Sequence, residues 1–230
     1  MTQPPLRTSR AASGRNLAAL VLRAWRLQVA GAENVPAEGP VILAANHLGL
    51  LDGAALAVAS PRPVHVLVKS EAFVPPLAGL LRGTDQIAID YDGPDRSALQ
   101  RALGVLEAGG VLGIFPEAHR GAGDVLHIRD GVAYLAARTG APVVPVAVLG
   151  TRPPGRGKDA LPPARSRLDV VLGHAVDIRV DGDPRRRAVL ARSGERLRQV
   201  LADHVRDVCA LTGQTLPGPL PAPTAERSHA

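Results

Sequence analysis

A histidine and an aspartate five positions apart, His47 and Asp52, are the residues of this sequence best suited to acid–base chemistry. Side chains five apart do not face each other on a straight helix, so these two meet only if the chain bends between them. Gly49 permits such a bend, because glycine tolerates left-handed backbone angles. We therefore predict His47 at the end of a strand and Asp52 in the first turn of the next helix. An aspartate bound to one imidazole nitrogen leaves the other nitrogen able to accept a proton.

A second polar segment, Phe115-Pro116-Glu117-Ala118-His119-Arg120, follows another apolar run. Ligands of open α/β sheets bind beyond the carboxyl ends of the strands. There, Glu117 suits a hydroxyl group and Arg120 suits a phosphate, to which arginine donates two hydrogen bonds. Each segment also has an ordinary alternative. His47 and Asp52 could be a loop histidine and a helix cap, and residues 115–120 could be a solvated loop.

The elements that must position these residues alternate between strands and helices. Continuous apolar runs predict buried strands, and apolar residues at helical spacing predict helices. Pro145 lies within one predicted strand and indicates an edge, a bulge or a strand end. The pattern predicts a single α/β domain with a mostly parallel central sheet flanked by helices. Strands are expected at 41–45, 64–68, 86–89, 111–115, 142–149 and 168–172, and helices at 53–59, 94–108, 130–138 and 184–211.

The two ends of the chain differ from this central domain, which we place at residues 29–213. Residues 1–13 are expected to be disordered, and so is the proline-rich tail at 214–230. Residues 14–28 form an expected amphipathic helix, with Leu17, Leu20 and Trp25 opposite a face rich in arginine. Such a helix could lie in a membrane interface or could pack on the core. No apolar run reaches the roughly 18–20 residues of a membrane-spanning helix.

Composition narrows the classes of function. The chain of 230 residues is 46% hydrophobic, which indicates a folded protein. Aromatic residues make up only 2%, which argues against single-stranded nucleic-acid binding, because that needs stacking platforms. The net charge of +6 suits phosphates or anionic lipid, although a preference for arginine over lysine can also reflect genomic base composition. We expect a cytoplasmic protein, peripheral on the inner face of the membrane.

Three ordered segments resemble the glycerolipid acyltransferase family, typified by 1-acyl-glycerol-3-phosphate acyltransferases. Residues 46–52 (NHLGLLD) resemble its N-H-x4-D block, residues 115–120 (FPEAHR) its F-P-E-G-T-R block, and residues 143–147 (VVPVA) its V-P-V block. The resemblance covers roughly residues 29–180 and implies a glycerol-3-phosphate acyltransferase-like fold. It also implies acyl transfer from acyl-CoA or acyl carrier protein to a hydroxyl of a lysophospholipid.

The resemblance implies that His47 is the general base and that Asp52 orients it. No metal or cofactor is expected, and the expected partners are a lipid substrate, a membrane surface and the acyl carrier protein, with no nucleic acid. The residues expected to bind substrate are Asn46, Lys69, Tyr91, Glu117, His119 and Arg120.

Two departures from the family pattern concern the acceptor. Tyr91 stands where the family carries an arginine associated with the acceptor's phosphate, and Ala118-His119 replaces Gly-Thr in the third block. The same chemistry on an acceptor without phosphate is therefore the first alternative. An inactive lipid-binding protein is the second, and the intact His47 and Asp52 weigh against it. The residues that could replace the missing positive charge are Arg82, Arg96 and Arg129.

Overall fold

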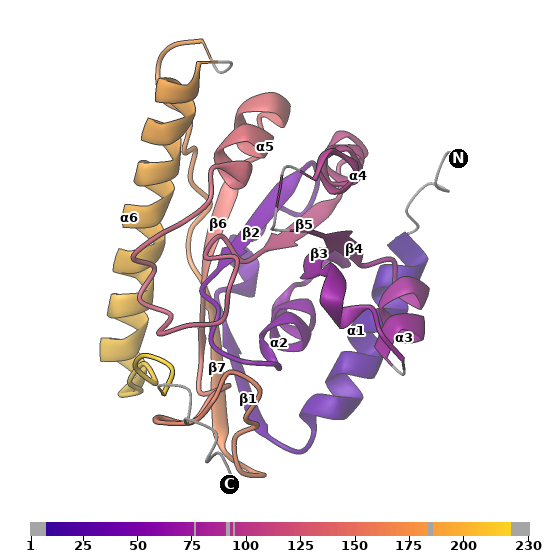
Figure 1. Ribbon diagram of the computed structural model, residues 1–230, viewed down its shortest axis with the longest axis vertical. Helices are drawn as coiled ribbons and strands as arrows, with labels where there is room; N and C mark the ends of the chain where they lie inside the picture. The colour runs from indigo at the N-terminus through magenta and orange to yellow at the C-terminus, as the bar shows by residue number, and fades with distance from the viewer. Residues whose placement is uncertain (1–7, 76, 91–92, 94, 184–185, 222–230) are drawn as a thin grey trace, which may run out of the picture.

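The computed structural model describes residues 8–75, 77–90, 93, 95–183 and 186–221. These residues form a seven-stranded sheet in the order β1-β7-β6-β2-β5-β3-β4, with helices packed on it (Figure 1). Strands β2 to β6 run in one direction, and β7 and β1 run in the opposite direction. The predicted α/β fold with a mostly parallel sheet is confirmed. The strands are β1 Arg26–Ala30, β2 Val41–Ala45, β3 Val64–Lys69, β4 Ile87–Ile89, β5 Val111–Ile114, β6 Val143–Leu149 and β7 Arg167–Leu172.

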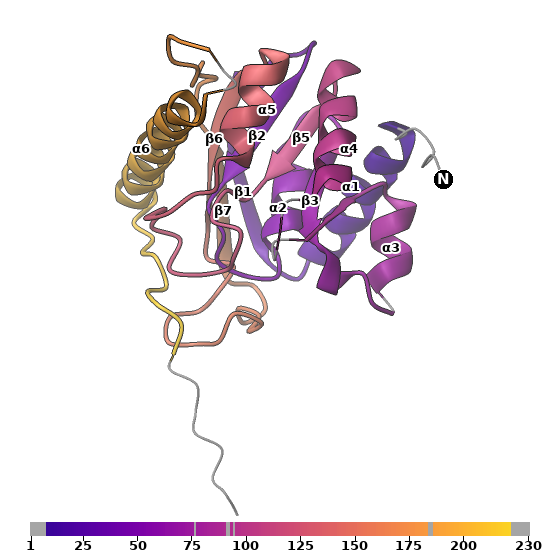
Figure 2. The ribbon, with the colours of Figure 1, turned by 45° about the horizontal axis from the view of Figure 1, so that its top comes forward.

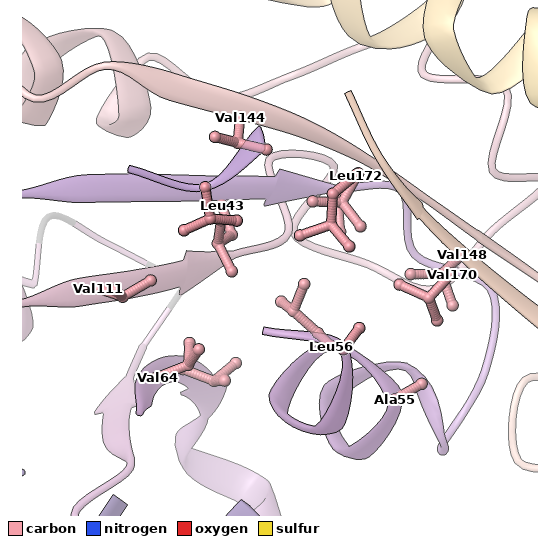
Figure 3. Close-up of a cluster of buried hydrophobic side chains, with 14 of the residues drawn as sticks. Leu43, Ala55, Leu56, Val64, Val111, Val144, Val148, Val170 and Leu172 are labelled. Carbon is pink, nitrogen blue, oxygen red and sulfur yellow. The ribbon is translucent and has the colours of Figure 1, made fainter. Parts of the chain in front are cut away.

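The central strand β2 is fully buried and divides its side chains between the two faces of the sheet. Successive strand residues point to opposite faces, so Leu43 packs toward one helical layer and Ile42 toward the other. Figure 3 shows Leu43 and neighbouring strand residues around Leu56 of helix α2. This two-sided packing explains the continuous apolar run of β2. The helices are α1 Thr8–Leu22, α2 Asp52–Ala59, α3 Leu77–Gly83, α4 Arg96–Glu107, α5 Gly131–Thr139 and α6 Arg187–Thr212.

The helices divide between the two faces. Residues of α1 and α2 join the core cluster on the Leu43 side, and α4 and α5 join the cluster on the Ile42 side. Helix α6 packs against β6, with Leu201, Val205 and Val208 facing Ala147 and Leu149. Figure 2 shows α6 on one side of the molecule and α1 with α3 on the other. Because β2, β3, β5 and β6 are parallel, their carboxyl ends lie at one edge of the sheet, where the loops that follow them come together.

Pro145 lies inside the sheet, because β6 pairs with both β2 and β7. Its carbonyl accepts a hydrogen bond of 2.8 Å from the N–H of Gly173, just beyond the end of β7 at Leu172. In a strand the N–H and C=O of one residue point to the same side, so the missing proline N–H faces the end of the β7 ladder. Pro145 therefore lies beside a strand end, as predicted, but the strand that ends there is β7 and not β6 itself.

The N-terminal helix differs from the prediction. Helix α1 spans Thr8–Leu22, so residues 8–13 are helical rather than disordered, and residues 26–28, expected in the helix, belong to β1. Small residues explain the shift: Ala11 is buried, and a Cβ on Gly14 would lie 2.8 Å from that of Thr84. The helix packs on the domain through these small residues. Leu22 at the end of the helix is buried as well, whereas Leu17, Leu20 and Val21 remain exposed.

The start of the C-terminal tail also differs from the prediction. Residues 214–221 lie against the domain instead of being disordered: Leu216 packs on the α6 cluster and Pro217 is buried. Gln214 donates through Nε2 to Asp169 Oδ2. Apolar side chains interspersed among the prolines give this segment a surface to bury. Residues 1–7 and 222–230, also expected to be disordered, lie outside the described residues.

Candidate active site

His47 and Asp52 meet at the carboxyl end of β2. His47 Nδ1 and Asp52 Oδ2 are 2.7 Å apart, and the main-chain N–H groups of Leu48 and Gly49 donate to the same oxygen at 2.6 and 2.8 Å. Asp52 is the first residue of α2, where the helix dipole favours a carboxylate. The loop thus wraps around one buried carboxylate, as the predicted bend requires.

Gly49 serves this bend by close approach rather than by a left-handed backbone, because its φ is not positive. A Cβ on Gly49 would lie 2.7 Å from the carbonyl oxygen of Thr151. Any larger residue would therefore push the loop away from the end of β6. The prediction named the correct residue for a different physical reason.

The imidazole of His47 is held on a second side by Phe115. The two rings stack with centroids 4.2 Å apart and an angle of 21° between their planes. The ring remains partly exposed, and within the described part of the chain only its Nδ1 is hydrogen-bonded. Since Nδ1 faces Asp52, Nε2 is the nitrogen that can accept a proton from a bound molecule.

Glu117 lies beside His47 and contacts its backbone. The N–H of His47 donates to Glu117 Oε2 at 2.8 Å. Burial raises the pKa of the Glu117 carboxyl to about 7, the hydrogen bond from His47 opposes the rise, and the negative charge of Asp124 adds to it. Near neutral pH the carboxyl is therefore partly protonated, and its oxygen helps to hold the backbone of His47 in place.

Asn46 does not fit its predicted role in binding substrate. It is fully buried, its Nδ2 donates to the carbonyl of Val148 at 3.1 Å, and its Oδ1 accepts from the N–H of Val148 at 2.7 Å. The side chain thus continues the β2–β6 hydrogen bonding beyond the end of β2. Its polar atoms are used to fix the strand that carries His47.

The other predicted substrate-binding residues are placed as follows. Arg120 forms an ion pair of 2.7 Å with Asp159 and also donates to the carbonyl of Lys158 at 3.1 Å. Lys69 Nζ lies 2.7 Å from Glu71, and His119 is exposed. Tyr91 lies outside the described residues. The structure therefore brings His47, Asp52 and Glu117 together, with Arg120 bound to a neighbouring loop.

Two residues of the site were missed from the sequence. Thr151 and Arg152 follow β6 and are buried, and Thr151 Oγ1 donates to Asp52 Oδ1. Arg152 donates to the carbonyls of Gly121 and Gly218 at 2.9 and 2.6 Å. Polar residues just beyond a buried parallel strand are the signal that could have found them.

A cavity of about 290 Å³ opens beside Phe115, between the ends of β3 to β5 and helices α4 and α5. Its walls are largely apolar, and the exposed Arg96 and Arg129 also line it. This volume is at the lower end of the range of small-molecule pockets. The described residues contain no group of three or more potential metal-ligating side chains, and no helix among them is long and apolar enough to cross a membrane.

Comparison with known proteins gives consistent matches. The family model described as "Acyltransferase" matches residues 26–149. A 1-acyl-sn-glycerol-3-phosphate acyltransferase of Bacillus subtilis is 29% identical over 149 residues, covering 64% of this chain and 72% of that protein. An uncharacterised Mycobacterium tuberculosis protein is 29% identical over 154 residues, covering 60% of this chain and 41% of that protein.

The fold is also found among solved structures. The crystal structure of the 1-acyl-sn-glycerophosphate acyltransferase PlsC from Thermotoga maritima superposes with a TM-score of 0.65 at 23% identity, covering 88% of this chain and 79% of that one. The family match spans more than half of this chain and includes both His47 and Asp52. The chain therefore belongs to the glycerolipid acyltransferase family.

Proposed function

We propose that this enzyme transfers a fatty acyl group from a thioester, acyl-CoA or acyl carrier protein, to a hydroxyl of a lysophospholipid of the 1-acyl-glycerol-3-phosphate type. The observation that carries the proposal is the 2.7 Å contact of His47 Nδ1 with the buried Asp52 carboxylate, which leaves Nε2 available. The named activity of the Bacillus subtilis relative supports the choice of substrate class.

In the proposed reaction, His47 Nε2 removes the proton of the acceptor hydroxyl as its oxygen attacks the thioester carbonyl carbon. Asp52 stabilises the imidazolium that forms. The C–S bond then breaks, the thiolate leaves with the electron pair, and the proton on His47 passes to thiolate or solvent. Because the hydroxyl attacks the donor directly, the reaction needs no acyl-enzyme intermediate.

The lipid's apolar chain has a candidate location in the cavity beside Phe115. This cavity lies next to the residue that stacks on His47, so a chain within it would end near the reacting atoms. Arg96 and Arg129 line the same cavity together with Asp90 and Asp95, and the two arginines are the groups there that suit an anionic head group. These are two of the three arginines expected to replace the one missing at position 91.

Two observations favour a second candidate, the same reaction on an acceptor without phosphate. Arg120, the residue expected to bind phosphate, is already paired with Asp159 at 2.7 Å. Tyr91 in place of the family arginine points in the same direction. An anionic acceptor would have to compete with Asp159 for this guanidinium.

Release of thiol from acyl-CoA or acyl carrier protein, measured with a panel of acceptors, tests both candidates. Release with 1-acyl-glycerol-3-phosphate supports the leading proposal. Release only with lyso-lipids or alcohols that lack phosphate supports the second. If no donor and acceptor pair gives turnover, transferase activity is rejected in favour of the inactive lipid-binding alternative.

We also propose that the enzyme binds a membrane surface through α1 and α3, which lie side by side (Figure 1). Leu17, Leu20 and Val21 of α1 are exposed by 40% to 57%, and Leu77 and Leu80 of α3 are exposed as well. Apolar side chains on neighbouring helices, with Arg23 and Arg82 also exposed, suit a surface that enters the interface of anionic lipid. This attachment would present the site to lipid substrates.

A further inference from the structure

The Asp52 carboxylate is fully buried and accepts four hydrogen bonds. Three of them reach Oδ2 and come from His47, Leu48 and Gly49, which belong to the same short loop as Asp52 itself. The fourth reaches Oδ1 and comes from the hydroxyl of Thr151. A buried carboxylate needs a donor at each oxygen, since an unpaired buried acceptor is costly.

Thr151 belongs to a different part of the sheet from the other three donors. It follows β6, whose ladder with β2 continues to the pair Ala45 and Val146. The side chain of Asn46 then bridges to the backbone of Val148. The carbonyl of Thr151 also lies directly against Gly49. Thr151 is therefore positioned by β6, a different element from the loop that carries His47 and Asp52.

This origin matters for the orientation of the carboxylate. The donors Leu48 and Gly49 lie in the same loop as Asp52 and can shift together with it, whereas His47 is the side chain that Asp52 must align. The terminal torsion of an aspartate is broad, so its preferred rotamer does not fix the carboxylate plane. Among the described residues, Thr151 supplies the one hydrogen bond to Asp52 that comes from outside this loop. It therefore fixes the orientation of the carboxylate plane relative to β6.

Arg152, the next residue, is linked to the backbone of His47 through Gly121. Its guanidinium donates to the carbonyl of Gly121 at 2.9 Å, and the N–H of Gly121 donates to the carbonyl of His47 at 3.0 Å. Arg152 is 2% exposed, and burial lowers its pKa while the charge of Asp52 opposes that change. The two residues after β6 thus hold the histidine through both its aspartate and its own backbone.

We propose that Thr151 is a positioning residue, which aligns Asp52 with His47 through its hydroxyl and contacts no substrate itself. The inference rests on the proposed roles of His47 and Asp52. It assigns the end of β6 a function in the reaction that the sequence motif around His47 does not contain.

The test compares Thr151→Val, which keeps the shape but removes the hydroxyl, with Thr151→Ser, which keeps the hydroxyl. We expect Thr151→Val to lower kcat by about 10- to 100-fold while the KM values of donor and acceptor change less than about twofold. Thr151→Ser should retain kcat within about threefold of the native enzyme. A purely structural role would not separate kcat from KM in this way.

Controls keep the result interpretable. Thr212→Val removes a comparable hydroxyl, which donates to the carbonyl of Val208 at 2.7 Å, at the end of α6, and should leave kcat unchanged. Thr151→Ala serves if the valine variant does not fold, with rates normalised to folded protein by circular dichroism. Native kcat in Thr151→Val or Thr151→Ala, or equal losses in the serine and valine variants, overturns the inference.

The variant His47→Ala separates this inference from the proposed function. If His47→Ala is inactive but the hydroxyl of Thr151 can be removed without loss, only the role of Thr151 is rejected. If His47→Ala keeps the native rate, the proposed mechanism itself is rejected, and the role of Thr151 with it.

Discussion

At the scale of single residues, Glu117 combines a contact to the loop that carries His47 with a strongly shifted pKa. Its carboxyl accepts the N–H of His47, and its pKa rises from 4.5 to about 7 because the group is buried. The folded protein therefore holds this proton more tightly than the unfolded chain does. The resulting stability is complete below about pH 4.5 and is lost as the pH rises through about 7.

The variant Glu117→Gln should remove this pH dependence. Glutamine keeps an oxygen that can accept from His47 but does not ionise, and the shift corresponds to about 3 kcal/mol at pH 8. We expect the two proteins to have similar unfolding free energies near pH 4.5 and the variant to be the more stable at pH 8. Urea unfolding at both pH values measures this, and parallel pH curves for the two proteins would contradict the account.

Arg120 and Asp159 give a second residue-scale prediction, on the acceptor. If Arg120 binds an anionic head group, Asp159 competes for it, so Asp159→Asn should lower the KM for 1-acyl-glycerol-3-phosphate by about two- to fivefold, the size of an exposed ion pair. The KM for an uncharged acceptor should not change. Equal changes in the KM of charged and uncharged acceptors would show that Arg120 does not bind the phosphate.

At the scale of elements, the site depends on the contact between the β2–α2 loop and the end of β6. The variant Gly49→Ala places a Cβ against the Thr151 carbonyl and should lower kcat by at least about tenfold, because the loop must move outward. Gly53→Ala, four residues along in α2, is the matched control, since nothing lies within 4 Å of its added Cβ. Steady-state kinetics of the two variants compare them, and equal activity would contradict this packing argument.

How far the sequence predicted these elements depends on where their signals lie. The apolar run at 41–45 and the spacing of His47 and Asp52 predicted β2, the bend and α2, because the signal for each is local. Thr151 lies 99 residues from Asp52, so no spacing pattern could connect them. Asn46 was expected to bind substrate as part of the motif that resembles the family's, but its side chain is hydrogen-bonded to the backbone of Val148 in β6.

Helix α1 shows the same limit at the N-terminus. Its small buried residues carry little hydrophobic signal, so the periodicity of the larger leucines moved the predicted helix to residues 14–28. Leu17 and Leu20 are exposed whereas Leu22 is buried, and only the folded structure shows which face of the helix the domain covers.

At the scale of the whole molecule, the exposed leucines of α1 and α3 set the expected orientation on a membrane. Deleting residues 1–28 would also remove the buried Leu22 and part of β1, so surface substitutions are the cleaner test. Replacing Leu17, Leu20 and Val21 together by serine should weaken binding to anionic vesicles by about tenfold or more.

Vesicle co-sedimentation measures this binding. Leu211→Ser, at a leucine of α6 that is 79% exposed, is the control and should bind as the native protein does. Unchanged binding of the triple variant would place the membrane-contacting surface elsewhere.

The whole arrangement brings a sheet edge, two loops and a buried carboxylate to one imidazole. Thiol release by His47→Ala, with 1-acyl-glycerol-3-phosphate and acyl-CoA as substrates, tests the role of that imidazole most directly. Because general-base catalysis contributes about 10²- to 10⁴-fold, we predict that kcat/KM falls by at least about 10²-fold in folded protein. A variant that turns over at the native rate would contradict the mechanism.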